Sequence, residues 1–342
     1  MVRIDPEIHR ALAAAPKVEL HLHLDGAMSL PWLLARVRRR PAEGVDTVDR
    51  LAERLAFRTF PEFIQAWVWK SSFLDRYEDF ESLAESVLEG LARQGVVHVE
   101  PFLSTGQYER HGLEAWGVIE ATLRGAERAA RACGMTYGVI IDLIRDHGPD
   151  VAARRLEEIT PYRGQGIIGI GLGGSEQRFP PAPFAAVYAE AKRRGFRRVV
   201  HAGEAAGPPS VWEAIHTLAP ERIGHGIRAV EDPALLDRLV REGMPLEVCP
   251  TSNVQTGVVA GYAAHPLRRL FAAGARVTVN SDDPTFFGST LLDELTLCVT
   301  ELGFSLRELS VMAEHAAAAA FLDGAAHERL VMRVREGWAG LD

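Results

Sequence analysis

Short runs rich in valine, isoleucine and leucine alternate along the chain with longer segments whose apolar residues follow helical spacing. Eight of the short runs have the composition and length of β-strands. They begin at Val18, Gly95, Thr136, Gly166, Phe196, Arg222, Met244 and Ala275. Intervening segments such as FAAVYAEAKRRG, DPALLDRLVREG and HPLRRLFAAG are amphipathic, and each ends in a glycine, as helices often do.

Strands that alternate with helices pair in parallel, and eight of them with covering helices predict a (β/α)8 TIM barrel. An open, doubly wound sheet is the alternative. No Gly-x-Gly-x-x-Gly pattern follows the first strand, which disfavours a dinucleotide-binding sheet of that kind. We therefore expect residues 1–342 to form a single α/β domain.

The connection from Ser29 to Gln94 is far longer than an ordinary loop between a strand and a helix. It contains the aromatic-rich stretch FPEFIQAWVWKSSFLDRYEDF and is predicted to be a helical insertion, residues 29–94, that covers a pocket as a lid. Within it, Trp67 and Trp69 are expected to pack in the lid, and Lys70 is expected to be solvated.

Composition excludes several classes of protein. The chain is 47% hydrophobic and 25% charged, as soluble globular proteins are, and its net charge of −8 argues against a nucleic-acid partner. Cys133, Cys249 and Cys298 are odd in number and widely spaced, so a disulfide framework is not expected. No stretch has the length of a signal peptide core or a membrane span. These features predict a cytoplasmic protein with a small-molecule partner; they say nothing of its oligomeric state.

Polar residues gather where the predicted strands end. His21 and His23 follow the first strand, Gly174 the fourth, His201 and Glu204 the fifth, His225 the sixth, and Asp282 and Asp283 the eighth. In a TIM barrel, the carboxyl ends of the strands form the face that carries active sites. The other histidines are expected in the core or on the surface: His9, His98, His111, His147, His216, His265, His315 and His327.

Four of these residues suit a metal ion. His21 and His23 are two apart in a strand, so their side chains share a face and their Cα atoms lie ~6.6 Å apart. With His201 and Asp282 they offer three imidazoles and one carboxylate, a donor set typical of zinc, although iron, cobalt and manganese remain alternatives. One Zn²⁺ per chain is expected. None of the three lysines lies within a predicted strand, where it could bridge a second metal, and no paired cysteines are present.

A metal with an open coordination position activates water near neutral pH. His225 is then expected to orient that water and take up its proton, and Glu204 to deliver a proton to a substrate nitrogen. The alternative for Glu204 is a carboxylate that accepts hydrogen bonds at a helix start. Asp283 either caps the segment before Pro284 or accepts a hydrogen bond from substrate.

The segments ELHLHLDGA, VHAGEAAGP, RIGHG, EVCPTSNVQTG, HPL and NSDDP together resemble the motifs of the adenosine deaminase family of metal-dependent aminohydrolases, in the same order. The resemblance extends from about Pro16 to the last helix. It implies a (β/α)8 barrel and a hydrolytic attack on C6 of a purine. The resemblance implies zinc binding by His21, His23, His201 and Asp282, protonation of N1 by Glu204 and positioning of the attacking water by His225. It also implies substrate contacts by Asp283 at N7, by the Gly174 N–H at N3, by Asp25 at the ribose 5′-hydroxyl and by His23.

Two segments depart from the family pattern. The family's VELRFSP is VEPFLST here, and its DLAGDE is GLGGSE, so that Gly171 and Ser175 replace two acids. The resemblance implies deamination of adenosine or 2′-deoxyadenosine first, because Asp25 suits a free 5′-hydroxyl, whereas adenine-specific relatives tend to have glutamate there. Alternatives are free adenine, a 5′-substituted adenosine such as aminodeoxyfutalosine, and a catalytically silent purine-binding protein.

Overall fold

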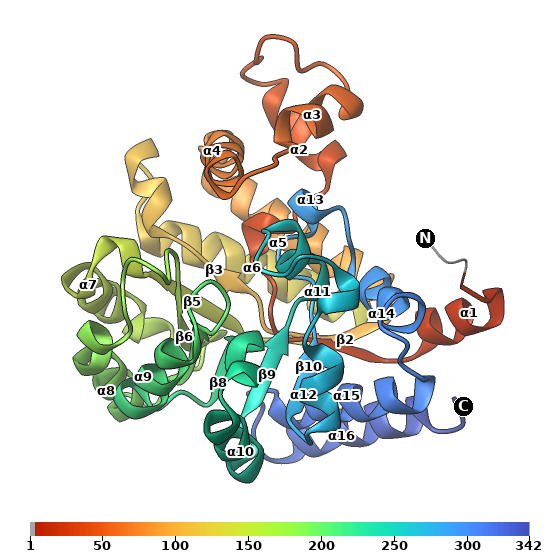
Figure 1. Cartoon of the computed structure of the whole chain (residues 1–342). Helices are drawn as coiled ribbons and strands as arrows, with labels where there is room; N and C mark the ends of the chain where they lie inside the picture. The colour runs from red at the N-terminus through yellow and green to blue at the C-terminus, as the bar shows by residue number, and fades with distance from the viewer. Residues whose placement is uncertain (1–3, 342) are drawn as a thin grey trace.

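The computed structural model describes residues 4–341, and the strands in this range pair in parallel around a barrel (Figure 1). The principal strands are β1 (Lys17–Glu19), β2 (Val96–Val99), β5 (Val139–Ile144), β6 (Ile167–Gly173), β7 (Arg197–Ala202), β8 (Arg222–His225), β9 (Pro245–Val248) and β10 (Arg276–Val279). Each overlaps one of the eight predicted runs, although β1 begins one residue before its run and ends at Glu19, before His21 and His23. The prediction of a (β/α)8 barrel is confirmed, with neighbouring strands following one another in sequence order from β5 to β10.

Two short strands complete the ring. β3 (Phe102–Leu103) continues the run that contains β2 and pairs with β5, while β4 (Thr136–Tyr137) precedes β5 and pairs with β2. The ring closes just beyond β1 and β10, where Leu22 and Asp282 form a parallel bridge. There the backbone N–H of His23 donates to the Asp282 carbonyl at 2.9 Å, and the Asp282 N–H donates to the His21 carbonyl at 2.9 Å.

The strands are buried because helices cover the outside of the barrel and side chains fill its inside. The helices from β3 onward are α6 (Ala115–Cys133), α7 (Pro149–Ile159), α8 (Ala185–Arg193), α9 (Pro208–Leu218), α10 (Pro233–Glu242), α11 (Pro250–Gln255), α12 (Leu267–Ala272), α13 (Pro284–Phe287), α14 (Leu291–Thr300), α15 (Leu306–Ala319) and α16 (Gly324–Trp338). The glycines that follow α8 and α10, Gly195 and Gly243, have φ of 80° and 63°, a region that an L side chain rarely adopts.

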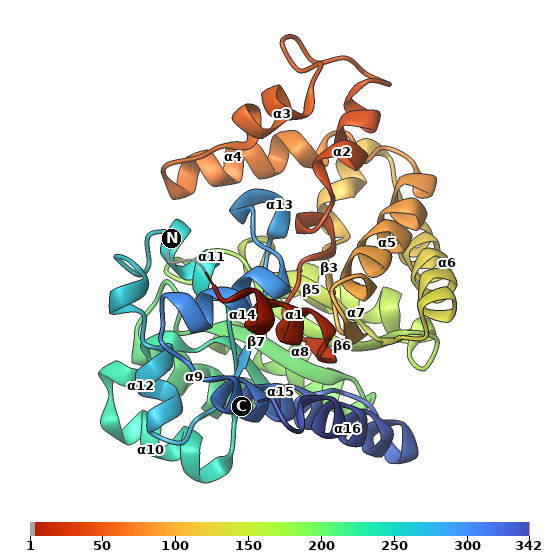
Figure 2. The ribbon, with the colours of Figure 1, turned by 90° about the vertical axis from the view of Figure 1, so that its right-hand side faces the viewer.

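An N-terminal helix, α1 (Pro6–Ala14), precedes the barrel, and four helices separate β1 from β2. These four are α2 (Leu30–Val37), α3 (Val48–Leu55), α4 (Phe60–Ser71) and α5 (Tyr77–Ala92). Figure 2 shows α2, α3 and α4 projecting above the rest of the molecule, while α5 runs beside α6. Residues 29–94 thus contain four helices, and the last of them, α5, packs against α6 and β2.

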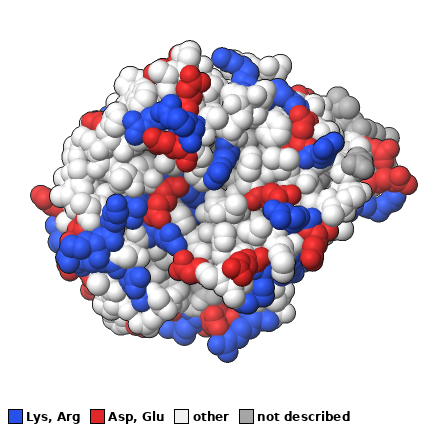
Figure 3. Space-filling model, turned by 90° about the horizontal axis from the view of Figure 1, so that it is seen from below, with Lys and Arg blue, Asp and Glu red and all other residues white. Residues whose placement is uncertain are grey.

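The surface carries mixed charge on the face opposite these projecting helices. Basic and acidic side chains are interspersed there (Figure 3). Several neighbouring helices are joined by ion pairs, such as Arg128 of α6 with Glu81 and Glu85 of α5. Within the described range, none of the helices combines the length and the apolar character that crossing a membrane would need.

Close packing of α5 on α6 generates a stability prediction. A Cβ at Gly125 of α6 would lie 1.9 Å from the carbonyl oxygen of Glu81, a backbone atom that cannot move aside. Gly125→Ala should therefore force the helices apart and lower the unfolding free energy by ~1–3 kcal/mol.

The matched control is Gly90→Ala in α5, where the nearest atom to the new methyl is 3.7 Å away at the end of the flexible Arg93 side chain. Alanine is a better helix former than glycine, so this variant should be as stable as the parent or more stable. Thermal or urea unfolding of both variants measures the difference. Equal stability of the two variants would contradict the close approach of α5 and α6.

Candidate metal centre and active site

The four predicted metal ligands come together at the carboxyl ends of the barrel strands. His23 Nε2 lies 3.4 Å from Asp282 Oδ1, and His21 Nε2 lies 3.7 Å from the same oxygen. The His201 ring, at the end of β7, has its centroid 4.5 Å from that of His21 and 5.4 Å from that of His23. All four side chains are largely or fully shielded from water.

The arrangement fits a bound cation. Burial and neighbouring imidazoles hold the pKa values of His21 and His201 well below their usual range, so both rings are neutral and can donate a lone pair. His21 Nε2 and His201 Nδ1 are buried without a hydrogen-bond partner among the described residues, which is costly unless something else binds there. Burial lowers the pKa of His23, but the carboxylates of Asp283 and Asp282 outweigh it and raise that pKa to about 9, as expected in surroundings that favour positive charge.

Two further donors lie at the same place. The donor atoms of His225, Cys249 and Asp282 fall within 4.8 Å of one another, as do those of His21, His201 and His225. Cys249 was not anticipated from the sequence, because no second cysteine accompanies it. Burial, together with nearby carboxylates such as Asp282, raises the pKa of the Cys249 thiol well above its usual range, which disfavours the thiolate that a metal binds.

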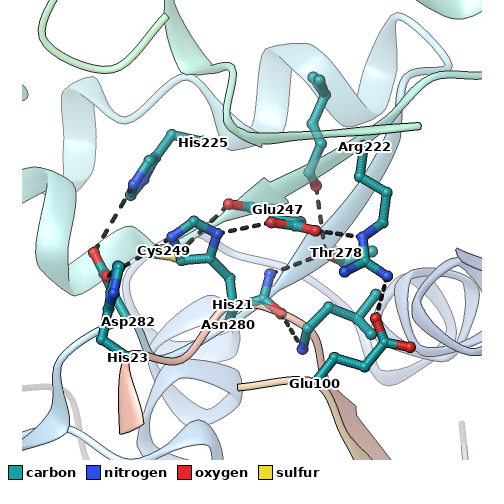
Figure 4. A network of polar contacts seen from close by, with 12 residues as sticks. His21, His23, Glu100, Arg222, His225, Glu247, Cys249, Thr278, Asn280 and Asp282 are labelled. Carbon is teal, nitrogen blue, oxygen red and sulfur yellow. Dashed lines mark hydrogen bonds and ion pairs between the residues drawn. The ribbon is translucent and has the colours of Figure 1, made fainter. Parts of the chain in front are cut away.

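A chain of buried charged groups fixes His21. Its Nδ1 lies 2.7 Å from Glu247 Oε2, and the other oxygen of Glu247 accepts from Arg222 Nε at 2.5 Å. Arg222 in turn donates to Glu100 at 2.6 Å (Figure 4). Because Nδ1–H donates to a carboxylate, Nε2 is left unprotonated and faces Asp282, the orientation that a metal-binding histidine needs. Glu247, Arg222 and Glu100 were also missed, since each lies in an ordinary strand pattern.

His225 is held by a second chain. Its Nδ1 lies 3.1 Å from the Asn253 amide nitrogen, and the Asn253 carbonyl oxygen lies 3.2 Å from His265 Nε2. His265 Nδ1 accepts from the Leu267 N–H at 3.1 Å, so its Nε2 carries the proton and donates to Asn253. Asn253 then donates to His225, whose proton is placed on Nε2, facing Glu204 at 3.6 Å. His265, expected to be an ordinary core or surface histidine, thus sets the tautomer of a site residue.

The backbone is strained at two of these positions. His225 has φ of 59° and Asp282 has φ of 61°, in the left-handed region that non-glycine residues rarely occupy. Among the described residues that are not glycine, only Ala219 shares a positive φ. Strain of this kind persists where surrounding contacts dictate the conformation, and it is common at functional sites.

Glu204 faces His225 at the end of the turn that follows β7. The N–H groups that open this turn donate instead to Glu176, at 2.6 Å from Gly203 and 3.1 Å from Glu204 itself. Glu176 thereby takes the role of a carboxylate at a helix start, which was the alternative for Glu204. Burial raises the pKa of Glu204 above its usual range, with Asp282 adding to the effect and His225 opposing it.

Asp283 follows the candidate metal ligand Asp282 in the chain, and its carboxyl packs against Gly26. Its Oδ1 is buried without a hydrogen-bond partner among the described residues, and burial together with the Asp282 charge raises its pKa well above the usual range. A Cβ at Gly26 would lie 1.7 Å from this oxygen, so only glycine leaves room for the carboxylate. An unpartnered carboxyl in this position is able to form a hydrogen bond with a polar group of a substrate.

Gly174 is placed at the rim by a buried arginine. Arg145 donates to the carbonyls of Gly173 at 3.2 Å and His201 at 2.6 Å, which ties the end of β6 to the end of β7. Gly174 itself has φ of 95°, and a Cβ there would lie 2.3 Å from Asp146 Oδ2. A glycine is therefore required where the family resemblance places the contact to N3.

Asp25 sits under the projecting helices. Its Oδ2 accepts from Gln107 Nε2 at 2.5 Å and from Tyr108 Oη at 2.6 Å, and its Oδ1 has no partner among the described residues. Lys70 of α4 donates to the Asp25 carbonyl oxygen. The expectation that Lys70 is solvated is wrong: it is fully buried, with Nζ 3.6 Å from the centre of the Trp67 ring.

The aromatic stretch of the insertion lies directly over the site. Trp67 stacks on Phe286 with ring centroids 5.3 Å apart and meets His23 edge-on at 6.2 Å. Its Nε1 donates to Gln107 at 3.1 Å. Trp69 packs away from the site against Phe73. Trp67 therefore roofs the metal ligands, and Trp69 packs within the insertion as expected.

Comparison with known proteins shows the family to which the chain is similar. A family model described as adenosine deaminase matches residues 16–337. Adenine deaminases from Rhodospirillum rubrum and Streptomyces coelicolor are 36% and 38% identical to the chain, covering 93% and 92% of it and 94% and 92% of their own lengths. The crystal structure of an adenine deaminase from Arthrobacter aurescens superposes with a TM-score of 0.89 at 32% identity, covering 94% of this chain and 99% of that one. An amidohydrolase from Burkholderia ambifaria with bound Zn has a TM-score of 0.89 at 26% identity, covering 99% and 93%.

The geometry predicts how metal content responds to mutation. His21→Ala should abolish metal binding, because it removes a central donor. Glu247→Gln should keep the metal but weaken its binding by about 10- to 100-fold, because the hydrogen bond that orients His21 loses its charge. Metal analysis and competition with a chromogenic chelator measure both effects, and His9→Ala, on the exposed side of α1, serves as the control. Full metal content with ordinary affinity in His21→Ala would refute the assignment.

Proposed function

Because this chain belongs to the adenosine deaminase family of hydrolases, we propose that it hydrolyses the 6-amino group of adenine, releasing hypoxanthine and ammonia. The observation that carries the proposal is the meeting of His21, His23, His201 and Asp282 beside Glu204 and His225 at one mouth of the barrel. The names of the relatives favour adenine over adenosine, the substrate that the motifs suggest first.

Crowding above the site also supports a small substrate. Asp25, which the family resemblance assigns to a ribose hydroxyl, has one carboxylate oxygen already engaged by Gln107 and Tyr108. Lys70 packs against Asp25 with the Trp67 ring on its ammonium group, and the His23 side chain is only 13% exposed. A planar base needs less room under this roof than a nucleoside does. The insertion, residues 29–94, would then be the lid of a single catalytic domain.

We assign His21, His23, His201 and Asp282 as the residues that hold one Zn²⁺. The ion would supply Lewis-acid chemistry, lowering the pKa of water so that it can act as a nucleophile near neutral pH. His225, with its proton on Nε2, is set to donate a hydrogen bond toward the site and to orient the water against C6. The pattern of hydrogen bonds through Asn253 favours this orienting role over acceptance of a proton.

Glu204 would supply the proton that makes C6 reactive. A ring nitrogen that takes up a proton withdraws electrons from the adjoining carbon, so N1 and the attacking water must lie on different sides of C6. The raised pKa of Glu204 keeps a proton available for this transfer. The Asp283 carboxyl, whose raised pKa favours the protonated form, would donate to N7, and the Gly174 N–H would donate to N3, so that three sides of the base are held. Water would add to C6 and the amino group would leave as ammonia. One of the two water protons would leave with the ammonia and the other would restore the Glu204 carboxyl, so that hypoxanthine keeps the proton on N1.

A catalytically silent purine-binding protein is the second candidate. It requires the metal ligands and the substrate contacts, but it has no use for an acid at N1. Glu204 is nevertheless positioned by five hydrogen bonds to Glu176, from the N–H groups of Gly203, Glu204, Ala205 and Ala206 and from the Ser210 hydroxyl. Because these hydrogen bonds fix the turn that carries Glu204, they favour an enzyme over a protein that only binds purines.

The substrate is tested by ammonia release from a panel of 6-aminopurines. The zinc-loaded protein should deaminate adenine with a kcat/KM well above those for adenosine, 2′-deoxyadenosine and a 5′-substituted adenosine. Treatment with a chelator should abolish the activity, and added Zn²⁺ should restore it. If a nucleoside gave a higher kcat/KM than adenine, that nucleoside and not adenine would be the substrate. No turnover of any of these compounds by the loaded protein would favour the silent alternative.

The role of Glu204 is tested by substitution and by pH. Glu204→Gln should retain metal and reduce kcat by about 10²- to 10⁴-fold, the range usual for loss of an acid catalyst. Glu213→Gln, in α9 away from the site, is the control.

The carboxyl must be protonated to act, and its pKa is raised, so kcat/KM should stay high above the usual pKa of glutamate and fall as pH rises through the raised value. The pH profile of kcat/KM for adenine measures this limb. Activity of Glu204→Gln near that of the parent, or a kcat/KM that continues to rise with pH, would exclude Glu204 as the acid.

A further inference from the structure

A buried carboxylate that has no role in the steps above lies beside the same site, next to His23. Asp142 is the fourth residue of β5, and its side chain is only 2% exposed. One oxygen, Oδ2, accepts from the Ser104 hydroxyl at 3.2 Å. The other, Oδ1, is buried without a hydrogen-bond partner among the described residues. A buried acceptor of this kind is costly unless a ligand satisfies it.

The position of Asp142 is made possible by the departure from the family pattern in GLGGSE. A Cβ at Gly173 would lie 2.9 Å from both carboxylate oxygens of Asp142, and a Cβ at Gly171 would lie 3.5 Å from Oδ1. The remaining space beside Gly171 is filled by the Phe102 ring, at 2.8 Å from that Cβ position. Glycines on β6 thus leave room for an acid that reaches across from β5.

The Asp142 carboxylate lies near the candidate metal ligand His23 but is not hydrogen-bonded to it. Asp142 Oδ2 lies 3.9 Å from His23 Nδ1, which is too long for a hydrogen bond. His23 Nε2 faces Asp282, so Asp142 lies on the side of His23 that is turned away from the metal. This is the side on which the base would extend from its reacting carbon.

The proposed contacts fix which edge of the base meets Asp142. In a purine, N3 and N9 flank the same carbon, on the edge opposite to N1 and C6. If the Gly174 N–H binds N3, N9 lies beside the wall formed by Gly173, where the Asp142 carboxylate is packed. In free adenine N9 carries a hydrogen, whereas in a nucleoside it is bonded to the sugar and has nothing to donate.

We propose that Asp142 is a specificity-determining residue that accepts a hydrogen bond from N9–H and so selects a free 6-aminopurine base over its nucleosides. The inference rests on the proposed function, since it places adenine in this site. An N9-substituted purine would leave Oδ1 unpaired and would press its substituent against the carboxylate. A site built around a polar group of the substrate discriminates strongly against analogues that lack it.

The test compares adenine with 9-methyladenine, which keeps the amino group but lacks the N9 hydrogen. The parent protein should have a much higher kcat/KM for adenine. Asp142→Ala should lower kcat/KM for adenine by about 10- to 100-fold, the usual loss for a hydrogen bond to a charged group. Because N9 is remote from C6, the loss should appear mainly in KM. The same variant should leave kcat/KM for 9-methyladenine unchanged or raise it, so that the preference collapses.

Two further variants separate recognition from structure. Asp142→Asn keeps an acceptor oxygen of the same size and should recover part of the adenine efficiency. Gly173→Ala retains the acid but displaces it, because the new methyl would collide with both carboxylate oxygens of Asp142. This variant should therefore also lower the preference for adenine over 9-methyladenine. Asp150→Asn, at the exposed start of α7, is the control. Metal content and thermal unfolding are measured on every variant, and equilibrium binding of hypoxanthine and 9-methylhypoxanthine gives a readout that does not depend on turnover.

The outcomes are distinct. Equal losses for adenine and 9-methyladenine in Asp142→Ala, with full metal content, would overturn the role in N9 recognition and leave a structural role beside His23. The role in N9 recognition would also be overturned if Asp142→Ala lost its metal while Gly173→Ala kept the parent's preference for adenine over 9-methyladenine. A parent protein that does not deaminate adenine at all would instead remove the proposed function, and this inference with it.

Discussion

The structure depends on the seam at which the first and last strands of the barrel meet. The backbone hydrogen bonds of His21 and His23 with Asp282 close the ring, and the same three residues carry donor atoms for the candidate metal. The same residues therefore close the barrel and assemble the site. Residues separated by some 260 positions become neighbours only because parallel strands place their carboxyl ends at one rim.

Burial of so many polar groups away from water costs free energy unless each group has a hydrogen-bond partner. Each neutral imidazole needs a donor or acceptor on its far nitrogen, and Glu247 and Asn253 supply it for His21 and His225. Arg222 and Glu100 extend the first of these chains to the opposite wall of the barrel. His21 Nε2, His201 Nδ1 and Asp283 Oδ1 are left unpaired at the site, where a cation and a substrate would satisfy them. Positive φ at His225 and Asp282 shows that this order is maintained against backbone preference.

The proposal of a small substrate rests on the layer of side chains above the candidate metal ligands. Trp67 and Lys70 come from the insertion after the first strand, and both rest on residues at the pocket mouth. The acidic residues Asp25, Asp142 and Asp283 surround His23, which suits a ligand rich in N–H donors and disfavours one with a phosphate. A neutral base with hydrogens on N6 and N9 matches such a pocket better than a nucleotide does.

The sequence by itself determined the eight strands, the helical insertion and the residues at the strand ends, because periodicity and motif spacing are local properties. It placed His21, His23, His201 and Asp282 at one rim for the same reason. Their supports, such as Glu247 and His265, carry no local signal, since what they contact is distant along the chain. Lys70 was misjudged because burial of a charge depends on the groups packed around it. The tautomers, the raised pKa of Glu204 and the placement of Asp142 in the space left by two glycines were decided only by the tertiary structure, which alone sets the distances through which charges and hydrogen bonds act.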